Sequence, residues 1–309
     1  MIKTIDIIVP FFNEEDVFEK FVQSLDLVRK KIELDEALKL NYIFVDNGSS
    51  DTTFEKISEY ENKNKNVTLI KLIRNFGIDG ALKAGIDKAK GDAAILIHGD
   101  LQDNPEIIIN LVNEWGNGFE HVIVRYSFQN RENLFRKLGS YFYYKWANYA
   151  SSNLIIKGVS DFRLISRRVL DFITSIDESV YLLRGILIWP GFKYKIIDAT
   201  KDKRLYGKSK INLPTIFKYF KLPISISTRV LFVIPIFSIS IFVISAIFII
   251  YTLIYFLVTG NLLIEIEPRL TLLIIINVFI LLFLGIISSY LGVLIEEVKN
   301  RPIYLEDDI

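Results

Sequence analysis

The stretch ILIHGDLQDNPE (residues 95–106) decides the fold of this chain. An apolar strand, residues 93–97, ends in a polar and acidic turn, residues 98–103. In an open sheet built from alternating strands and helices, ligands bind just beyond the carboxyl ends of the strands. The oxygen ligands of this turn suit a hard divalent cation such as Mg²⁺, which can neutralise a diphosphate. The same residues also fit a capped turn, with Asp103 or Asn104 before a helix that begins at Pro105, and both interpretations can hold together.

Strand and helix patterns alternate on either side of this turn. Strands are expected at residues 5–9, 42–45, 67–72, 93–97 and 122–124, and helices at residues 16–34, after Asp51 or Thr52, at 81–89 and at 131–151. This alternation predicts an α/β fold, with a mainly parallel sheet that carries helices on both faces. We expect residues 1–210 to form this one domain.

Composition excludes several classes of protein. The 309 residues carry a formal net charge of +1, so no global positive field indicates nucleic-acid binding. The chain has no cysteine, which excludes disulfides, thiolate zinc sites and cysteine catalysis. Residues 1–10 are expected to form a short strand, and the chain turns polar after it at residues 13–15, unlike a signal peptide; the domain is therefore expected to stay in the cytoplasm.

The C-terminal third has the pattern of a membrane hairpin. Residues 230–258 and 270–295 contain no charged side chain, and about 20 apolar residues are enough to cross a bilayer. We therefore expect two transmembrane helices within residues 229–309, with a buried hairpin of a soluble domain as the weaker alternative. Residues 211–228, with alternating apolar and basic side chains, are expected to lie in the membrane interface, or else to form an ordinary surface helix.

Basic residues flank this predicted hairpin at Lys218, Lys221, Arg229, Lys299 and Arg301. Since cytoplasmic loops carry an excess of Lys and Arg, the pattern favours a protein of the cell (inner) membrane with both termini in the cytoplasm.

Four strings in order resemble one family. They are IVPFFNEE (8–15), VDNGSSDT (45–52), RNFG (74–77) and HGDLQD (98–103). Together they resemble the GT-A (Rossmann-like) inverting glycosyltransferases of the dolichol-phosphate mannose synthase type. The predicted membrane hairpin narrows the resemblance to the polyprenyl-phosphate glycosyltransferases of bacteria and archaea. Matches at GVSDFRL (158–164), Arg184-Gly185 and RLYGKSK (204–210) support it.

The resemblance implies a site for a nucleotide-diphosphate sugar. The residues that it places there are Pro10, Asn13, Glu14, Asp46, His98 and Arg184. Asp46 would accept a hydrogen bond from the N–H edge of a uracil or guanine base.

The resemblance also implies a divalent metal, Mg²⁺ or Mn²⁺, held by Asp100 and Gln102. The family's usual motif is Asp-x-Asp, and here His98 takes its first position. A neutral imidazole can ligate Mn²⁺ but suits Mg²⁺ less, so His98 is either a third ligand or a hydrogen-bond donor to the sugar or diphosphate.

Two further groups of residues are implied for the acceptor and for catalysis. The acceptor phosphate would be held by Arg125, Arg131, Arg136 and Ser140. The catalytic set would be Asp100, Asp161, Arg204 and Lys210. In that set Arg204 and Lys210 would close over the diphosphate, and Asp161 would orient the acceptor or act as a base.

The expected reaction is transfer of a hexose to polyprenyl phosphate with inversion, in the service of cell-envelope glycan modification. UDP-glucose or a related UDP-hexose is the favoured donor, and GDP-mannose is a second possible donor. The sequence also leaves open whether the protein forms a homo-oligomer. Two alternatives remain at this point. One is a membrane glycosyltransferase whose acceptor is a sugar hydroxyl of a lipid-linked glycan, and the other is a non-catalytic, membrane-anchored scaffold that binds sugar nucleotides.

Overall fold

The computed structural model describes residues 2–34, 37–127, 142–143, 145–151, 154, 156–176, 178, 183–200, 231, 247, 250–251, 254–255, 257–258 and 266–307. The chain divides into two compact units. The first comprises Met1–Phe142, Leu154–Ile211 and Asn300–Ile309, and the second comprises Tyr143–Asn153 and Asn212–Lys299.

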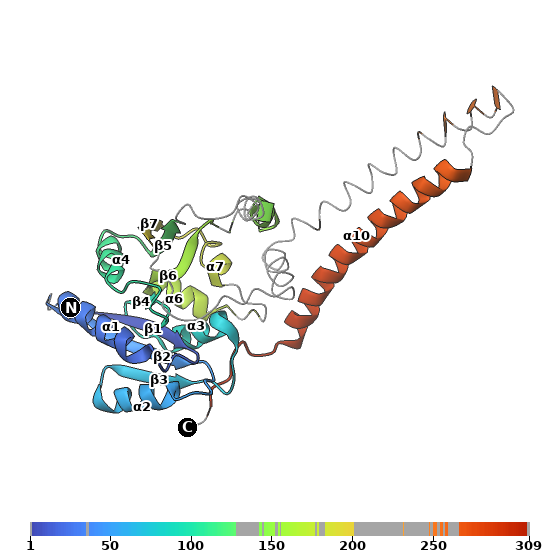
Figure 1. Ribbon diagram of the computed structural model, residues 1–309. Coiled ribbons are helices and arrows are strands. Elements are labelled where there is room, and N and C mark those ends of the chain that lie inside the picture. Colours follow the sequence, from blue (N-terminus) through green and yellow to red (C-terminus); the bar gives the residue numbers. More distant parts are fainter. Residues whose placement is uncertain are drawn as a thin grey trace. The chain divides into compact units, whose positions relative to one another are not determined.

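The first unit is built on a seven-stranded sheet with the order β3-β2-β1-β4-β6-β5-β7 (Figure 1). The strands are β1 (Lys3–Phe11), β2 (Leu38–Asp46), β3 (Val67–Lys71), β4 (Ala93–Leu96), β5 (His121–Ser127), β6 (Val159–Ser166) and β7 (Tyr194–Thr200). Only β6 runs against its neighbours, β4 and β5, and the other four pairings are parallel. The prediction of a mainly parallel sheet is therefore confirmed.

The helices of this unit bury an apolar core on each face of the sheet. They are α1 (Phe18–Glu33), α2 (Thr53–Lys63), α3 (Gly77–Lys88), α4 (Ile107–Gly116), α6 (Arg167–Thr174) and α7 (Leu183–Ile186). One core contains Phe18, Phe21 and Leu25 of α1 with residues of α2 and α4, and the other contains residues of α3, α6 and α7. Each of these helices therefore contributes apolar residues to one of the two cores.

Two parts of the fold differ from the sequence prediction. Helix α3 begins at Gly77, four residues before the expected start at residue 81. The Asn75 side chain accepts the Gly77 N–H at 2.8 Å, so an Asn-based turn starts the helix earlier than its apolar pattern does. The elements β6, β7, α6 and α7 had no assignment from sequence.

The second unit contains helix α10 (Ile266–Lys299) and a short helical stretch within residues 143–150. Within the part of the chain that the structure describes, no helix is long and apolar enough to cross a membrane. Three predicted segments lie outside the described residues: the interfacial segment 211–228, residues 131–141 of the helix expected at 131–151, and nearly all of residues 230–258.

Candidate active site

The loops that follow β1 and β2 are joined by hydrogen bonds. Asn13, in the left-handed region with φ 54°, accepts the Ser50 N–H at 2.8 Å and donates its own N–H to Ser49 Oγ at 3.1 Å. The Glu14 N–H donates to Thr53 Oγ1 at 2.9 Å. Two of the residues predicted to line the nucleotide pocket, Asn13 and Glu14, thus lie beside the turn after β2.

Pro10 and Asp46 lie at the carboxyl ends of these two strands. Pro10 pairs with Val45 in the parallel register, and both Pro10 and Asp46 are buried. Both oxygens of the Asp46 carboxylate lie 3.3 Å from the Ser49 N–H. Burial raises the pKa of Asp46, while the bonds from Ser49 act against that rise. Bonds of this length are weak, so Asp46 retains capacity to accept a stronger donor.

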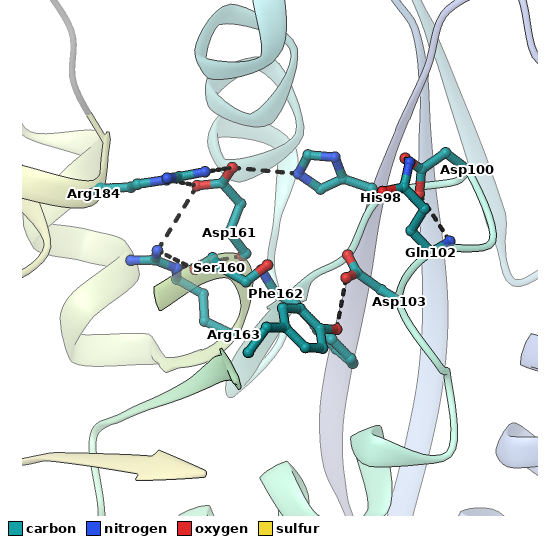
Figure 2. Close-up of polar contacts among 10 residues, drawn as sticks. His98, Asp100, Gln102, Asp103, Ser160, Asp161, Phe162, Arg163 and Arg184 are labelled. Carbon is teal, nitrogen blue, oxygen red and sulfur yellow. Dashed lines mark hydrogen bonds and ion pairs between the residues drawn. The ribbon is translucent and has the colours of Figure 1, made fainter. Parts of the chain in front are cut away.

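The turn after β4 brings Asp100 and Gln102 together (Figure 2). Asp100 Oδ1 accepts the Gln102 N–H at 3.1 Å, and Asp100 Oδ2 accepts from Gln102 Nε2 at 2.6 Å. Leu101 between them has φ 58°, which folds the two side chains back toward each other. Both residues are half-buried.

Neighbouring residues hold this turn in place. Asp103 is buried, and its Oδ1 accepts from the Tyr126 hydroxyl of β5 at 2.6 Å. A Cβ at Gly99 would lie 2.2 Å from Cε1 of the buried Phe11 ring. Glycine is therefore required at position 99, because any side chain would displace the turn from the core.

His98 points toward Asp161 rather than toward Asp100 and Gln102 (Figure 2). Its Nε2 lies 3.4 Å from Asp161 Oδ2. Burial lowers the pKa of His98, but the Asp161 carboxylate outweighs this and the net shift is upward. The orientation of the ring fits a partner of Asp161 better than a third metal ligand.

Asp161 is a buried carboxylate surrounded by cations. Arg184 donates to it twice, from Nε to Oδ1 and from Nη2 to Oδ2, each at 2.6 Å. Burial alone would raise the pKa of Asp161, but Arg184 and His98 hold it well below the usual range. Because an acid of that kind binds a proton weakly, the geometry favours an orienting role for Asp161 over the role of a base.

Two residues that the sequence did not single out complete this cluster. Arg163 is 1% exposed, and burial lowers its pKa to about 10. Its Nη2 donates to the Ser160 carbonyl at 2.6 Å and lies 3.8 Å from Asp161 Oδ1. Asp79 has its pKa raised to about 6, first by burial and then by Asp161. Arg163 stands two residues from Asp161 on β6, and this spacing in a strand is a signal that both side chains share one face. No comparable signal marks Asp79.

Arg125 pairs with an acid of the neighbouring strand. Its Nε and Nη2 donate to the two oxygens of Asp198 at 2.6 and 2.9 Å, and the two residues are register partners of β5 and β7. Asp198 was not predicted. A phosphate at Arg125 would therefore share the guanidinium with Asp198 or displace it.

The other predicted acceptor and lid residues lie outside the described residues. These are Arg131, Arg136, Ser140, Arg204 and Lys210.

The turn after β4 offers a divalent metal only a small set of protein ligands. Among the described residues, no group of three or more His, Asp or Glu could hold a metal ion. Asp100 and Gln102 nevertheless supply a carboxylate and an amide, the hard oxygen donors that Mg²⁺ and Mn²⁺ accept. The residues present thus fit an ion that takes its remaining ligands from a diphosphate and water.

Comparison with known proteins identifies the family. An uncharacterized glycosyltransferase of Synechocystis is 30% identical over 99% of this chain and 95% of its own. A prophage-derived bactoprenol glucosyl transferase of Shigella flexneri is 32% identical over 97% of this chain and 96% of its own. The glucosyl-3-phosphoglycerate synthase of Mycobacterium tuberculosis, solved with Mn²⁺, UDP-glucose and phosphoglyceric acid, aligns at a TM-score of 0.45, with 17% identity over 74% of this chain and 79% of its own. The model of glycosyl transferase family 2 matches residues 6–174, and the chain therefore belongs to that family.

Proposed function

We propose that this glycosyltransferase moves a glucose, or a closely related hexose, from a UDP-sugar to polyprenyl phosphate with inversion at the anomeric carbon. Family membership supports sugar transfer from an activated donor. The names of the Shigella relatives, which align with nearly the whole chain, support glucose as the sugar and a bactoprenol carrier as the acceptor.

One observation carries this proposal, namely the contact between Asp100 and Gln102 in the turn after β4. Both residues are half-buried and follow β4 at the carboxyl end of the sheet, where the loops after the parallel strands β1 and β2 also begin. A divalent ion bound there would neutralise charge that develops on the leaving diphosphate. Asn13, Glu14 and the buried Asp46 are proposed to bind the nucleoside.

The nucleophile in this proposal is an oxygen of the lipid phosphate. It attacks the anomeric carbon as the bond to the diphosphate breaks, and the electron pair of that bond leaves with UDP. A phosphate monoester has a second pKa of about 6, so the nucleophile is already ionised at neutral pH. A strong base is unnecessary, in keeping with the pairing of Asp161 with Arg184 and His98.

The acceptor site is proposed to contain Arg125, Arg131, Arg136 and Ser140, with Arg204 and Lys210 on the diphosphate. Guanidinium groups can bind phosphate through two parallel hydrogen bonds, which suits a charged lipid headgroup. The uncharged stretches 230–258 and 270–295, with their basic flanks, support the further proposal that the enzyme works at the cytoplasmic side of the cell membrane.

The test is a product assay with the full-length chain. Purified protein is incubated with undecaprenyl phosphate, Mg²⁺ or Mn²⁺, and a panel of UDP- and GDP-sugars, and the lipid product is read by mass spectrometry. We expect the lipid to gain one hexose from UDP-glucose. We expect NMR of the product to show that the anomeric configuration is inverted relative to the donor. Transfer only to a sugar hydroxyl would support the alternative acceptor, and nucleotide binding without turnover in any mixture would support a scaffold.

A further inference from the structure

The segment that follows α10 returns to the sheet of the first unit. Residues 300–307 are here called the tail, and an isolated antiparallel bridge joins Glu306 of the tail to Leu72, the residue that follows β3. The Ile73 N–H donates to the Leu305 carbonyl at 3.2 Å, and the Asp307 N–H donates to the Lys71 carbonyl at 2.8 Å. Residues 305–307 of the tail therefore pair with the carboxyl end of β3 and the two residues that follow it.

Side chains of the tail also bind the elements on either side of the β3–α3 loop, residues 72–76. Tyr304 donates its hydroxyl to Asp87 of α3 at 3.0 Å, and Asp307 pairs with Lys71 of β3 at 2.9 Å. The carbonyl of Ile303 approaches within 3.2 Å of the position that a Cβ at Gly80 would take. The tail therefore contacts the start of the loop at Lys71 and Ile73, and it contacts helix α3, which follows the loop, at Gly80 and Asp87.

The opposite side of the same loop holds the turn after β2. Asn47 donates to the Gly77 carbonyl at 3.1 Å and accepts the Phe76 N–H at 3.0 Å. Gly48, with φ 70°, packs so closely that a Cβ would lie 2.5 Å from the Arg74 carbonyl carbon. A small shift of the loop would therefore move residues 46–48.

Lys71 connects the tail with Asp46 by charge as well. Asp46 and Lys71 are register partners on β2 and β3, and the Leu72 N–H donates to the Asp46 carbonyl at 2.9 Å. Hydrogen bonding to Asp307 raises the pKa of Lys71, and the charge of Asp46 adds to the rise. Lys71 in turn acts against the rise that burial causes in the pKa of Asp46.

We propose that the tail is a positioning element for the nucleotide-binding turn, residues 46–48, which it holds through the β3–α3 loop. Tyr304 and Asp307 are its positioning residues, and they touch neither donor nor acceptor. The inference deepens the proposed function and rests on it, because it takes residues 46–48 as part of the donor site. Since the tail follows α10 directly, the segment predicted to lie in the membrane and the donor site are connected through eight residues, 300–307.

The test uses the full-length chain with the double variant Tyr304→Phe/Asp307→Pro. The first change removes only the hydroxyl that binds Asp87. The second removes both the ion pair with Lys71 and the N–H that donates to its carbonyl, since proline has no N–H. The matched control is Asp171→Asn, which breaks an ion pair with Arg167 on α6 at 2.8 Å.

Two measurements are made on each protein. Amide hydrogen exchange without ligand should be about tenfold faster at Ile73 and Phe76 in the double variant, with α6 unaffected. Affinity for UDP with Mg²⁺, by calorimetry, should fall about three- to tenfold, as expected for lost hydrogen bonds, while the KM for polyprenyl phosphate stays unchanged. The control should match the wild type in both.

Unchanged exchange at Ile73 and Phe76 would overturn the inference, as would an unchanged affinity for UDP in a variant whose loop exchanges faster. If the double variant loses affinity for UDP and for polyprenyl phosphate equally, the inference is also overturned, because an equal loss would indicate general destabilisation. Failure of the proposed function has a different signature. In that case the wild type binds no UDP, while the exchange measurement still decides whether the tail positions the turn.

Discussion

Arg184 binds both carboxylate oxygens of Asp161, through Nε and Nη2 at 2.6 Å each. The pair joins α7 to β6, two elements that close one end of the site. With His98 at 3.4 Å and the buried Arg163 at 3.8 Å, the single negative charge of Asp161 faces three basic side chains. The pair is therefore expected to set both the stability and the geometry of this end of the site.

Replacing Arg184 tests that expectation. Arg184→Ala should lower the free energy of unfolding by about 1–3 kcal/mol, because Asp161 loses two charge-assisted hydrogen bonds. Arg184→Lys should recover only part of the loss, since an ammonium group cannot form the two-pronged contact. Urea unfolding measures both. Arg168→Ala, which removes an exposed ion pair with Glu120, serves as the control and should change stability by less than about 1 kcal/mol. Equal effects of Arg184→Ala and Arg168→Ala would contradict the assignment.

Asp100→Ala should abolish most of the transfer while leaving the fold intact. Asp100 is half-buried in a turn and packs into neither core, so the thermal midpoint should change little. Loss of a group that stabilises developing charge lowers kcat by about a hundredfold or more. The kcat with saturating Mg²⁺ and a thermal melt check both statements. A variant with normal stability and full turnover would remove the proposed metal site.

His98→Gln should not alter the preference between Mg²⁺ and Mn²⁺. The Nε2 of His98 faces Asp161, and its ring points away from Asp100 and Gln102. Exchanging an imidazole for an amide in the direct coordination of a metal would change its preference, because nitrogen ligands favour Mn²⁺ over Mg²⁺. Activity as a function of each metal concentration measures this. A shift toward Mg²⁺ would instead make His98 a ligand.

Asp79 should give the protein a pH-dependent stability. Its pKa is raised to about 6 in the folded state from an ordinary value near 3.8, so the folded protein binds this proton more tightly than the unfolded chain. The stabilising contribution of this proton to folding is fully present below pH 3.8 and is lost as the pH rises to about 6. The free energy of unfolding therefore falls by about 3 kcal/mol over roughly two pH units. Asp79→Asn should remove this loss. In urea unfolding, the stability of the variant relative to the wild type should increase between pH 4 and pH 7. If the free energies of unfolding of the two proteins run parallel with pH, the prediction is refuted.

The sequence predicted the parts of the site that local pattern determines. Asp100 and Gln102 are two residues apart in one turn, and that turn follows an uninterrupted apolar strand, so their proximity needs no knowledge of the rest of the fold. Arg125 and Asp198 are 73 residues apart in sequence, and their pairing depends instead on β7 lying beside β5. The contact between Asp161 and His98 depends on β6 entering the sheet next to β4 in the reversed direction. No periodicity predicts such an insertion, because it follows from the order of strands and not from any one of them.

The pairing of the tail with β3 has a consequence for solubility. An uncovered edge strand presents unpaired N–H and C=O groups, which form a template for strands of other molecules and so for aggregation. In this chain, residues 305–307 form hydrogen bonds with the carbonyl of Lys71 and the N–H of Ile73. The charged side chains of Glu306 and Asp307 lie beside these bonds. A version cut after Lys299 to remove the tail would leave the carbonyl of Lys71 and the N–H of Ile73 unpaired at the end of β3, and we expect it to self-associate even with every residue of the site in place.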